Sequence, residues 1–126
     1  MSLTVTVTEK EAGVFSVSPV GSIDSNTYTI LEKEVDAILG ASPRAIILDM
    51  EGVVYMSSMG VRIILKAGKA LKQSEGRLVV GNLQPQIKKV FEIINVLPCH
   101  EIFESVEELD RYLDVMQRKD IEGRRE

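Results

Sequence analysis

A short apolar run followed by a segment with helical spacing is the feature that most constrains the fold. Residues 45–48 (Ala-Ile-Ile-Leu) are apolar and rich in β-branched side chains, which is typical of a buried strand. Ser57 and Ser58 follow. The apolar residues after them recur at helical spacing, at Val61, Ile64, Leu65 and Leu71. A buried strand followed closely by an amphipathic helix favours the α/β class.

The N-terminal residues predict a β-hairpin. Threonines alternate with apolar residues from Leu3 to Val7, and a polar turn ends at Gly13 before the alternation resumes, so the predicted hairpin covers residues 2–20. Pro19 has no backbone N–H to donate to a neighbouring strand. It therefore predicts that the second strand ends there or lies at a sheet edge.

The middle of the chain predicts helices and strands in turn. A helical face runs from Tyr28 to Leu39, and Gly40 is a natural stop for it. The further predicted elements are strands at 44–50 and 77–80, a helix at 58–74, and a third helix that starts at Pro85 and buries Ile87, Val90, Phe91 and Ile94.

The C-terminal residues predict one more strand and one more helix. Residues 102–103 are a short strand candidate, and Ser105 with Glu108 forms a capping box. The apolar face of the helix that follows consists of Val106, Leu109, Leu113 and Met116. Residues 118–126 are almost all charged and predict a frayed tail. We therefore expect one α/β domain at 1–117, followed by this tail.

Composition excludes several classes of function. The chain has 126 residues, a net charge of −4 and a pI of about 5.1, which disfavours a direct nucleic-acid partner. It has no apolar run long enough to span a membrane and no signal-peptide pattern. Cys99 is its only cysteine, so an internal disulfide is impossible and a cytoplasmic location is the default expectation.

The two serines allow two interpretations. Serine is a preferred N-cap, so one of Ser57 and Ser58 is expected to begin the helix while the other lies beside it at the positive end of the helix dipole. The simpler interpretation is that both serve only as a cap. In the other, one of them carries a phosphate, whose charge of about −1.5 to −2 would suit free N–H groups at a helix start and could break a partner contact.

The polar side of the predicted helix carries a row of basic residues, at Arg62, Lys66, Lys69 and Lys72. Charged residues usually face water, so a solvated face is the simpler interpretation. The alternative is a basic docking face beside the serines.

The sequence lacks the residue patterns of common catalytic sites. It has no phosphate-loop motif, no dinucleotide glycine fingerprint and no Gly-x-Ser-x-Gly elbow. Cys99 and His100 are sequence neighbours, whereas a nucleophile and its base usually meet through the fold. Asp24 and Asp49 could form an acid–base pair, but isolated carboxylates at strand ends are more often structural. We therefore expect a protein that is not an enzyme and has no cofactor or metal site.

In order and spacing, these elements resemble the STAS domain, and in particular the bacterial anti-sigma factor antagonists. The resemblance covers about residues 3–117 and rests on residues 21–24 (Gly-Ser-Ile-Asp), 45–48, 55–62 (Tyr-Met-Ser-Ser-Met-Gly-Val-Arg) and 85–91 (Pro-Gln-Ile-Lys-Lys-Val-Phe). It implies a mixed sheet of four to five strands covered by about four helices, and a protein that acts by binding.

The resemblance also implies a regulated exchange of partners. An unphosphorylated antagonist captures an anti-sigma factor, often itself a serine kinase, and so frees the sigma factor for transcription. Phosphorylation blocks this capture and a serine phosphatase restores it. The matching phosphoacceptor is Ser58. Ser57 is the alternative, because it stands where the best-known pattern, Asp-Ser-Ser-Gly, has the aspartate, while Met59 replaces the second serine.

The positions that the resemblance assigns to partner binding lie around these serines. They are Asp24, Ser57, Ser58, Met59, Arg62, Ile63 and Lys66. A monomer or weak dimer is expected. The alternative function is that of an accessory subunit for a membrane transport complex, because STAS domains also serve such complexes.

Overall fold

A computed structural model describes residues 2–96, 111, 114–115 and 117–118 of the chain. Its strands are β1 (Leu3–Glu11), β2 (Val14–Ile23), β3 (Ala45–Asp49), β4 (Val53–Met56) and β5 (Arg77–Gly81). Its helices are α1 (Tyr28–Leu39), α2 (Ser58–Gln73) and α3 (Pro85–Val96). The predicted α/β class is confirmed.

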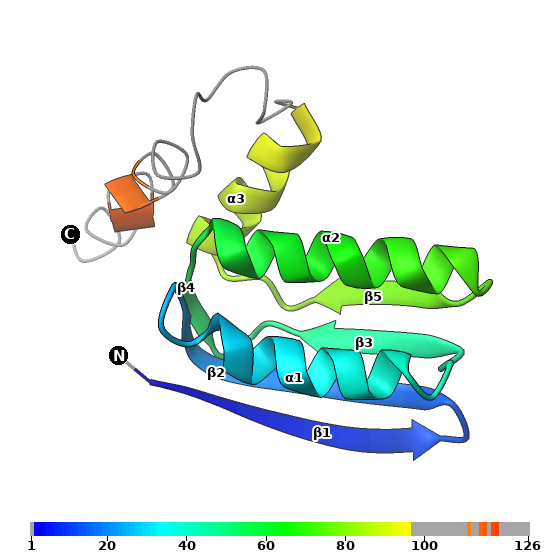
Figure 1. Ribbon diagram of the computed structural model, residues 1–126. Coiled ribbons are helices and arrows are strands. Elements are labelled where there is room, and N and C mark those ends of the chain that lie inside the picture. The colour runs from blue at the N-terminus through cyan, green and yellow to red at the C-terminus, as the bar shows by residue number, and fades with distance from the viewer. Residues whose placement is uncertain (1, 97–110, 112–113, 116, 119–126) are drawn as a thin grey trace.

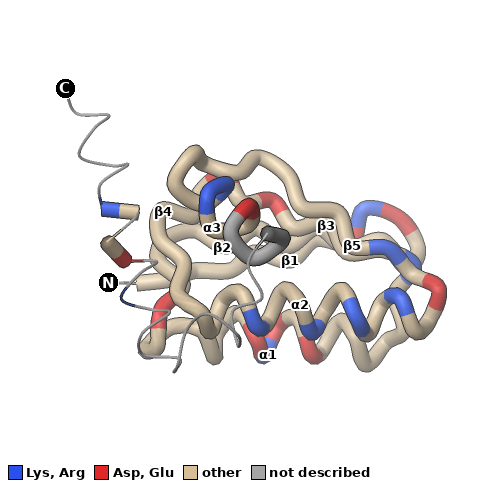
Figure 2. The backbone as a smooth tube through the Cα atoms, turned by 90° about the horizontal axis from the view of Figure 1, so that it is seen from above, with Lys and Arg blue, Asp and Glu red and all other residues tan. Residues whose placement is uncertain are grey.

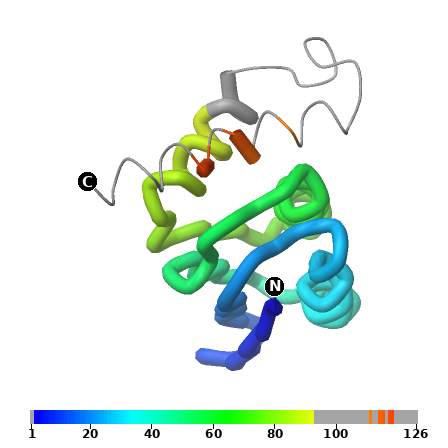
Figure 3. The backbone as a smooth tube through the Cα atoms, turned by 90° about the vertical axis from the view of Figure 1, so that its left-hand side faces the viewer, coloured from blue at the N-terminus to red at the C-terminus, as the bar shows by residue number. Residues whose placement is uncertain are grey.

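The sheet is mixed, and β2 is at its centre. The order is β1-β2-β3-β5, and β4 pairs with a different part of β2. β1 is antiparallel to β2, whereas β3, β4 and β5 all pair in parallel. The predicted hairpin and the predicted four to five strands are therefore confirmed. Helices α1 and α2 lie side by side over one face of the sheet, and α3 lies beside β4 (Figures 1 and 3).

The prediction for Pro19 is wrong, because β2 neither ends there nor lies at an edge. β3 pairs with β2 up to Val17, and β4 pairs with it from Gly21 onward. The Gly21 N–H donates to the Gly52 carbonyl at 2.9 Å, and alternate residues of a strand present their backbone groups to the same side. The nitrogen of Pro19 therefore faces the gap between β3 and β4, where a missing N–H costs no ladder bond.

β4 was not predicted as a strand of its own. No strand was predicted at residues 53–56, yet the side chains of Val53 and Met56 are fully buried. β4 is four residues long and its one strand partner among the described residues is β2. A strand this short has no sequence period of its own to predict it.

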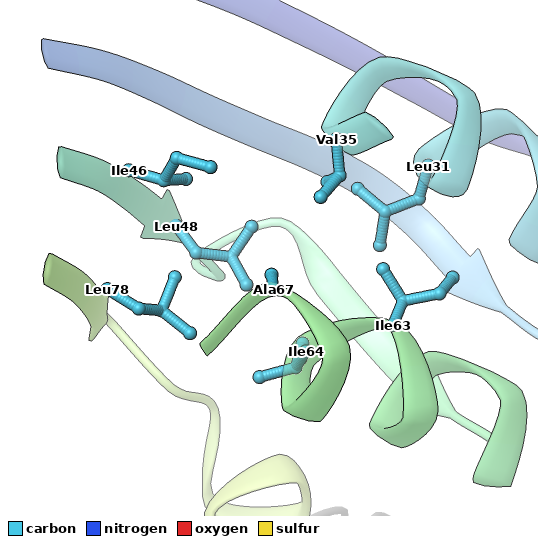
Figure 4. Close-up of a pocket in the computed structure, with 8 residues that line it drawn as sticks. All are labelled: Leu31, Val35, Ile46, Leu48, Ile63, Ile64, Ala67 and Leu78. Carbon is cyan, nitrogen blue, oxygen red and sulfur yellow. The ribbon is translucent and has the colours of Figure 1, made fainter. Parts of the chain in front are cut away.

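The core lies between the sheet and the pair α1 and α2. Alternation along β3 turns Ile46 and Leu48 toward the helices, and the helical period brings Leu31 and Val35 of α1 to meet them. Within this core is an apolar void of about 10 Å³, at the lower limit for one water molecule (Figure 4). Its lining consists of Leu31, Val35, Ile46, Leu48, Ile63, Ile64, Ala67 and Leu78.

The apolar face of α2 differs in one place from the prediction. Val61, Ile64 and Leu71 are buried as expected, but Leu65 is 56% exposed. Leu65 lies about 100° around the helix from Ile64, which turns it away from the sheet. It is therefore a surface apolar residue.

The predicted C-terminal elements lie largely outside the described residues. This applies to the strand at 102–103, the Ser105–Glu108 capping box and most of the last helix and tail. Arg111, Asp114, Val115, Gln117 and Arg118 are helical. About four helices were predicted. The described part of the chain contains the three helices α1, α2 and α3 and, in addition, these helical positions.

Candidate functional site

Ser57 caps the start of helix α2. Its backbone is extended (φ −89°, ψ 177°), and its Oγ accepts a hydrogen bond from the Met59 N–H at 3.2 Å. Ser58 is the first residue of the helix. The prediction that one of the two serines caps the helix is confirmed, with Ser57 as the cap. A second bond holds this turn in place, because the Ser57 N–H donates to the Ile23 carbonyl at 2.8 Å.

Both serines are buried in this conformation. Ser57 is 5% exposed and Ser58 is 3% exposed. The sequence indicated that both would be at a helix start, but the burial of their hydroxyls depends on tertiary packing. An enzyme that modifies either side chain therefore requires a local opening of this turn.

Gly60 permits the helix to start close to the sheet. A Cβ at this position would lie 2.8 Å from Ile23 Cγ2 and 2.8 Å from Met56 Cγ. Real Cβ atoms are essentially never so close to other heavy atoms, so any other residue would push the start of α2 away from β2 and β4. The glycine two residues after Ser58 thus has a packing role.

Asp24 organises the loop that lies next to the serines. Its Oδ1 accepts hydrogen bonds from the N–H groups of Asn26 at 2.8 Å and Thr27 at 3.0 Å. The Asp24 N–H in turn donates to Thr27 Oγ1 at 2.9 Å. The loop follows Ile23, whose carbonyl receives the Ser57 N–H, so the two turns are adjacent. Asp24 therefore supports the shape of the site through its own loop.

The basic row of α2 faces solvent, as the simpler interpretation predicted. Arg62, Lys66, Lys69 and Lys72 are all exposed. The adjacent helix α1 presents acidic residues, and Figure 2 shows blue basic positions along α2 beside red acidic ones on α1. Lys66 Nζ lies 3.1 Å from Asp36 Oδ1 in an ion pair that joins the two helices.

A surface groove runs between α1 and α2, directly after the serines. It is lined by Glu32, Met59, Arg62, Ile63, Leu65 and Lys66. The structure thus brings together the predicted partner-binding residues Met59, Arg62, Ile63 and Lys66. Glu32 and Leu65 were missed, because the sequence does not show which face of α1 borders α2.

Asp49 lies in a second polar cluster, at the end of β3. Its Oδ1 accepts hydrogen bonds from Asn82 Nδ2 at 3.1 Å and from the Glu51 N–H at 3.1 Å. The Asn82 hydrogen bond, and after it the Glu51 hydrogen bond, lowers the pKa of Asp49 below its usual value. Asp24 and Asp49 each support a separate turn, which does not favour the acid–base pair considered from sequence.

Other chemistry has little support in the described residues. Nowhere among them do three or more His, Cys, Asp or Glu side chains gather as metal ligands would. None of their helices combines the length and the apolar character that crossing a bilayer requires. The Cys99–His100 pair considered from sequence lies outside the described residues.

A search of protein-family models decides the family. The model for the STAS domain matches residues 6–109, which is most of the chain. The chain belongs to the STAS domain family. The resemblance stated from sequence is confirmed.

Relatives of this STAS chain have names that concern sigma-factor control. It is 33% identical over 99 residues to BtrV of Bordetella bronchiseptica, whose name describes a candidate anti-sigma factor antagonist; the match covers 79% of this chain and 85% of BtrV. A crystal structure of an anti-sigma factor antagonist from Mycobacterium paratuberculosis is 28% identical with a TM-score of 0.60, and the match covers 77% and 84% of the two chains.

The fold is also that of SpoIIAA from Bacillus. The structure of SpoIIAA in its phosphorylated form has a TM-score of 0.64 and 20% identity, over 75% of this STAS chain and 86% of SpoIIAA. At this identity the likeness concerns the fold alone. The predicted phosphorylation and partner-binding residues stay predictions.

Proposed function

We propose that this STAS chain is an anti-sigma factor antagonist that acts by binding an anti-sigma factor through the start of α2 and the groove between α1 and α2. The observation that carries the proposal is that the start of α2, with its two serines, continues directly into the groove. Met59 follows the serine pair directly and lines the groove. The names of BtrV and of the Mycobacterium paratuberculosis protein support it.

The groove has the chemistry of a docking site for an apolar side chain flanked by carboxylates. Its apolar lining comes from Met59, Ile63 and the exposed Leu65. Arg62 and Lys66 provide positive charge at its rim, where Glu32 adds one carboxylate. Complementary charges at a rim guide association, while buried apolar contacts provide most of the affinity.

Phosphorylation of Ser58, or alternatively of Ser57, switches this binding off. A phosphate adds a charge of about −1.5 to −2 at a surface that otherwise attracts acidic groups. The start of α2 is the positive end of the helix dipole, which favours a negative charge there. Repulsion and the bulk of the phosphate then exclude the partner. The partner is an anti-sigma factor with serine kinase activity, and a serine phosphatase reverses the modification.

The test is a pull-down from the native organism with wild type, Ser58→Ala and Ser58→Glu. We expect wild type and Ser58→Ala to retain an anti-sigma factor or a kinase-like ATPase, and Ser58→Glu to lose it. Since Ser58 is 3% exposed, each variant is first checked by circular dichroism for its fold. Ser74→Glu is the matched control, because Ser74 is an exposed serine at the other end of the same helix.

Equal recovery of the same partners by wild type and both Ser58 variants would show that Ser58 is only a structural residue at the start of α2. The same series at Ser57 then tests the alternative phosphoacceptor. Recovery of a membrane transport complex in place of an anti-sigma factor would overturn the proposal in favour of the accessory-subunit function.

A further inference from the structure

Among the described residues, strand β4 has a strand partner on one edge only. It pairs with β2, and its last bond on that side runs from the Ser57 N–H to the Ile23 carbonyl. Because alternate residues face opposite edges, the backbone groups of Val54 and Met56 point the other way. Buried backbone groups need hydrogen-bond partners, so this outer edge must be completed by something other than a strand.

Two glutamine side chains form hydrogen bonds with three of its backbone groups. Gln86 Nε2 donates to the Val54 carbonyl at 3.1 Å. Gln117 Oε1 accepts from the Met56 N–H at 3.0 Å, and its Nε2 donates to the Met56 carbonyl at 2.8 Å. A carboxamide has the same donor and acceptor as a peptide group. Gln117 therefore provides both hydrogen bonds that a neighbouring strand would provide.

The Gln117 contact is buried and connects distant parts of the chain. Gln117 is 0% exposed, and 61 residues separate it from Met56. Met56 directly precedes the buried pair Ser57 and Ser58. Gln117 is thus fixed to the backbone that leads into the serine turn.

The two sides of this turn are held with different strength. On the side of β2, a backbone bond from Ser57 and the close packing of Gly60 against Ile23 fix the helix start. On the outer side, the Met56 backbone is held by one side chain. Its two hydrogen bonds are weak compared with the free energy of global unfolding, so they can break without it.

We propose that Gln117 is a latch for the serine turn: breaking its two hydrogen bonds to Met56 opens the turn and exposes Ser58. The second part of this proposal rests on the proposed function: a kinase or phosphatase acts on Ser58 only in the opened form. The opening of the latch then sets the rate of phosphorylation and dephosphorylation, although Gln117 itself does not contact the anti-sigma factor.

The first test measures exposure chemically and needs no partner. Ser58→Cys is made in a Cys99→Ser background, and the rate of alkylation by iodoacetamide is compared with and without Gln117→Glu. The glutamate keeps an acceptor for the Met56 N–H but places a carboxylate against the Met56 carbonyl. We expect labelling to be about tenfold faster or more, as the loss of a buried hydrogen bond implies.

The matched control is Gln73→Glu, the same change at an exposed residue at the end of α2. It should leave the labelling rate unchanged. Equal labelling rates for Ser58→Cys with and without Gln117→Glu, with both proteins folded by circular dichroism, would overturn the latch.

If Gln117→Glu does not fold, the labelling rate of Ser58→Cys alone is measured over a series of urea concentrations. A local opening gives labelling that depends only weakly on urea, whereas labelling with the slope of global unfolding refutes the latch. Alkylation by iodoacetamide reports only on the opening of the turn, and the pull-down reports only on the partner. The two experiments can therefore support the latch and refute the anti-sigma proposal, or refute the latch and support the anti-sigma proposal.

Discussion

The Ser57 N–H donates to the Ile23 carbonyl at 2.8 Å, and this bond joins the start of α2 to the end of the central strand. It places the serine turn against the loop that begins with Asp24. The geometry of the candidate site therefore depends on how closely α2 approaches β2, and Gly60 sets that approach.

Gly60→Ala should destabilise the fold by about 1–3 kcal/mol, the usual cost of overpacking a core. Its Cβ would lie 2.8 Å from both Ile23 Cγ2 and Met56 Cγ. Gly68→Ala is the control on the same helix, because its Cβ would meet only Leu78 Cδ2 at 3.5 Å. That variant should gain up to about 1 kcal/mol from helix propensity. Urea unfolding of both proteins measures the difference, and equal effects would refute this account of Gly60.

The glycine pair shows what sequence could and could not predict. Periodicity predicted α2 and its serine cap, because helix spacing and capping are local. At Gly68, the other glycine within α2, the structure has room for a Cβ. The close approach occurs instead at Gly60, and it depends on where Ile23 and Met56 lie in the fold.

Tertiary pairing explains the other misses. β4 and the exposure of Leu65 depend on neighbours far away in the chain, as does the contribution of Glu32 to the groove. The family resemblance located Met59 and Arg62 because its motif carries tertiary information that local periodicity lacks. Neither the family motif nor local periodicity predicts the burial of Ser58, because burial depends on how the helices and strands pack together.

Leu31→Ala should lower the free energy of unfolding by about 2–5 kcal/mol. Leu31 is 0% exposed and already borders the internal void, so truncation enlarges a cavity that the stiff sheet cannot close. Ile30→Ala, one residue earlier on α1 and 43% exposed, is the control and should cost much less. Thermal or urea unfolding distinguishes them. A similar loss in both variants would contradict the packing of α1 described here.

Asn82→Gly should raise the pKa of Asp49 toward its ordinary value, since the Asn82 hydrogen bond is the main cause that lowers it. Glycine suits the positive φ of 58° at this position, so the backbone is not strained. Carboxyl NMR titration measures the change. A pKa for Asp49 that is the same in both proteins would contradict this role for Asn82.

The same hydrogen bond makes stability depend on pH. Because the pKa of Asp49 is lowered in the folded state, its contribution is present above the unfolded value of about 3.9 and is lost as pH falls through the lowered folded value. The gap in unfolding free energy between wild type and Asn82→Gly should therefore narrow below about pH 4. In an Asp49→Asn background the gap should no longer vary with pH in this range.

Charge reversal at Arg62 and Lys66 should weaken partner binding by about tenfold or more, mainly through slower association. Both side chains line the groove beside the serine turn. The Lys66–Asp36 ion pair is about half exposed, so its loss should cost less than about 1 kcal/mol of stability. The control is reversal of Lys69 and Lys72, which changes charge equally on the same helix but outside the groove.

Surface plasmon resonance with the partner recovered by pull-down measures both pairs at low and at high salt. The effect at Arg62 and Lys66 should shrink at high salt, because ions screen exposed charges. An equal loss of affinity in both pairs would indicate a general effect of net charge on α2. Unchanged affinity after reversal of Arg62 and Lys66 would mean that the basic row is only a solvated helix face, and the groove would then have to bind its partner through Met59, Ile63 and Leu65 alone.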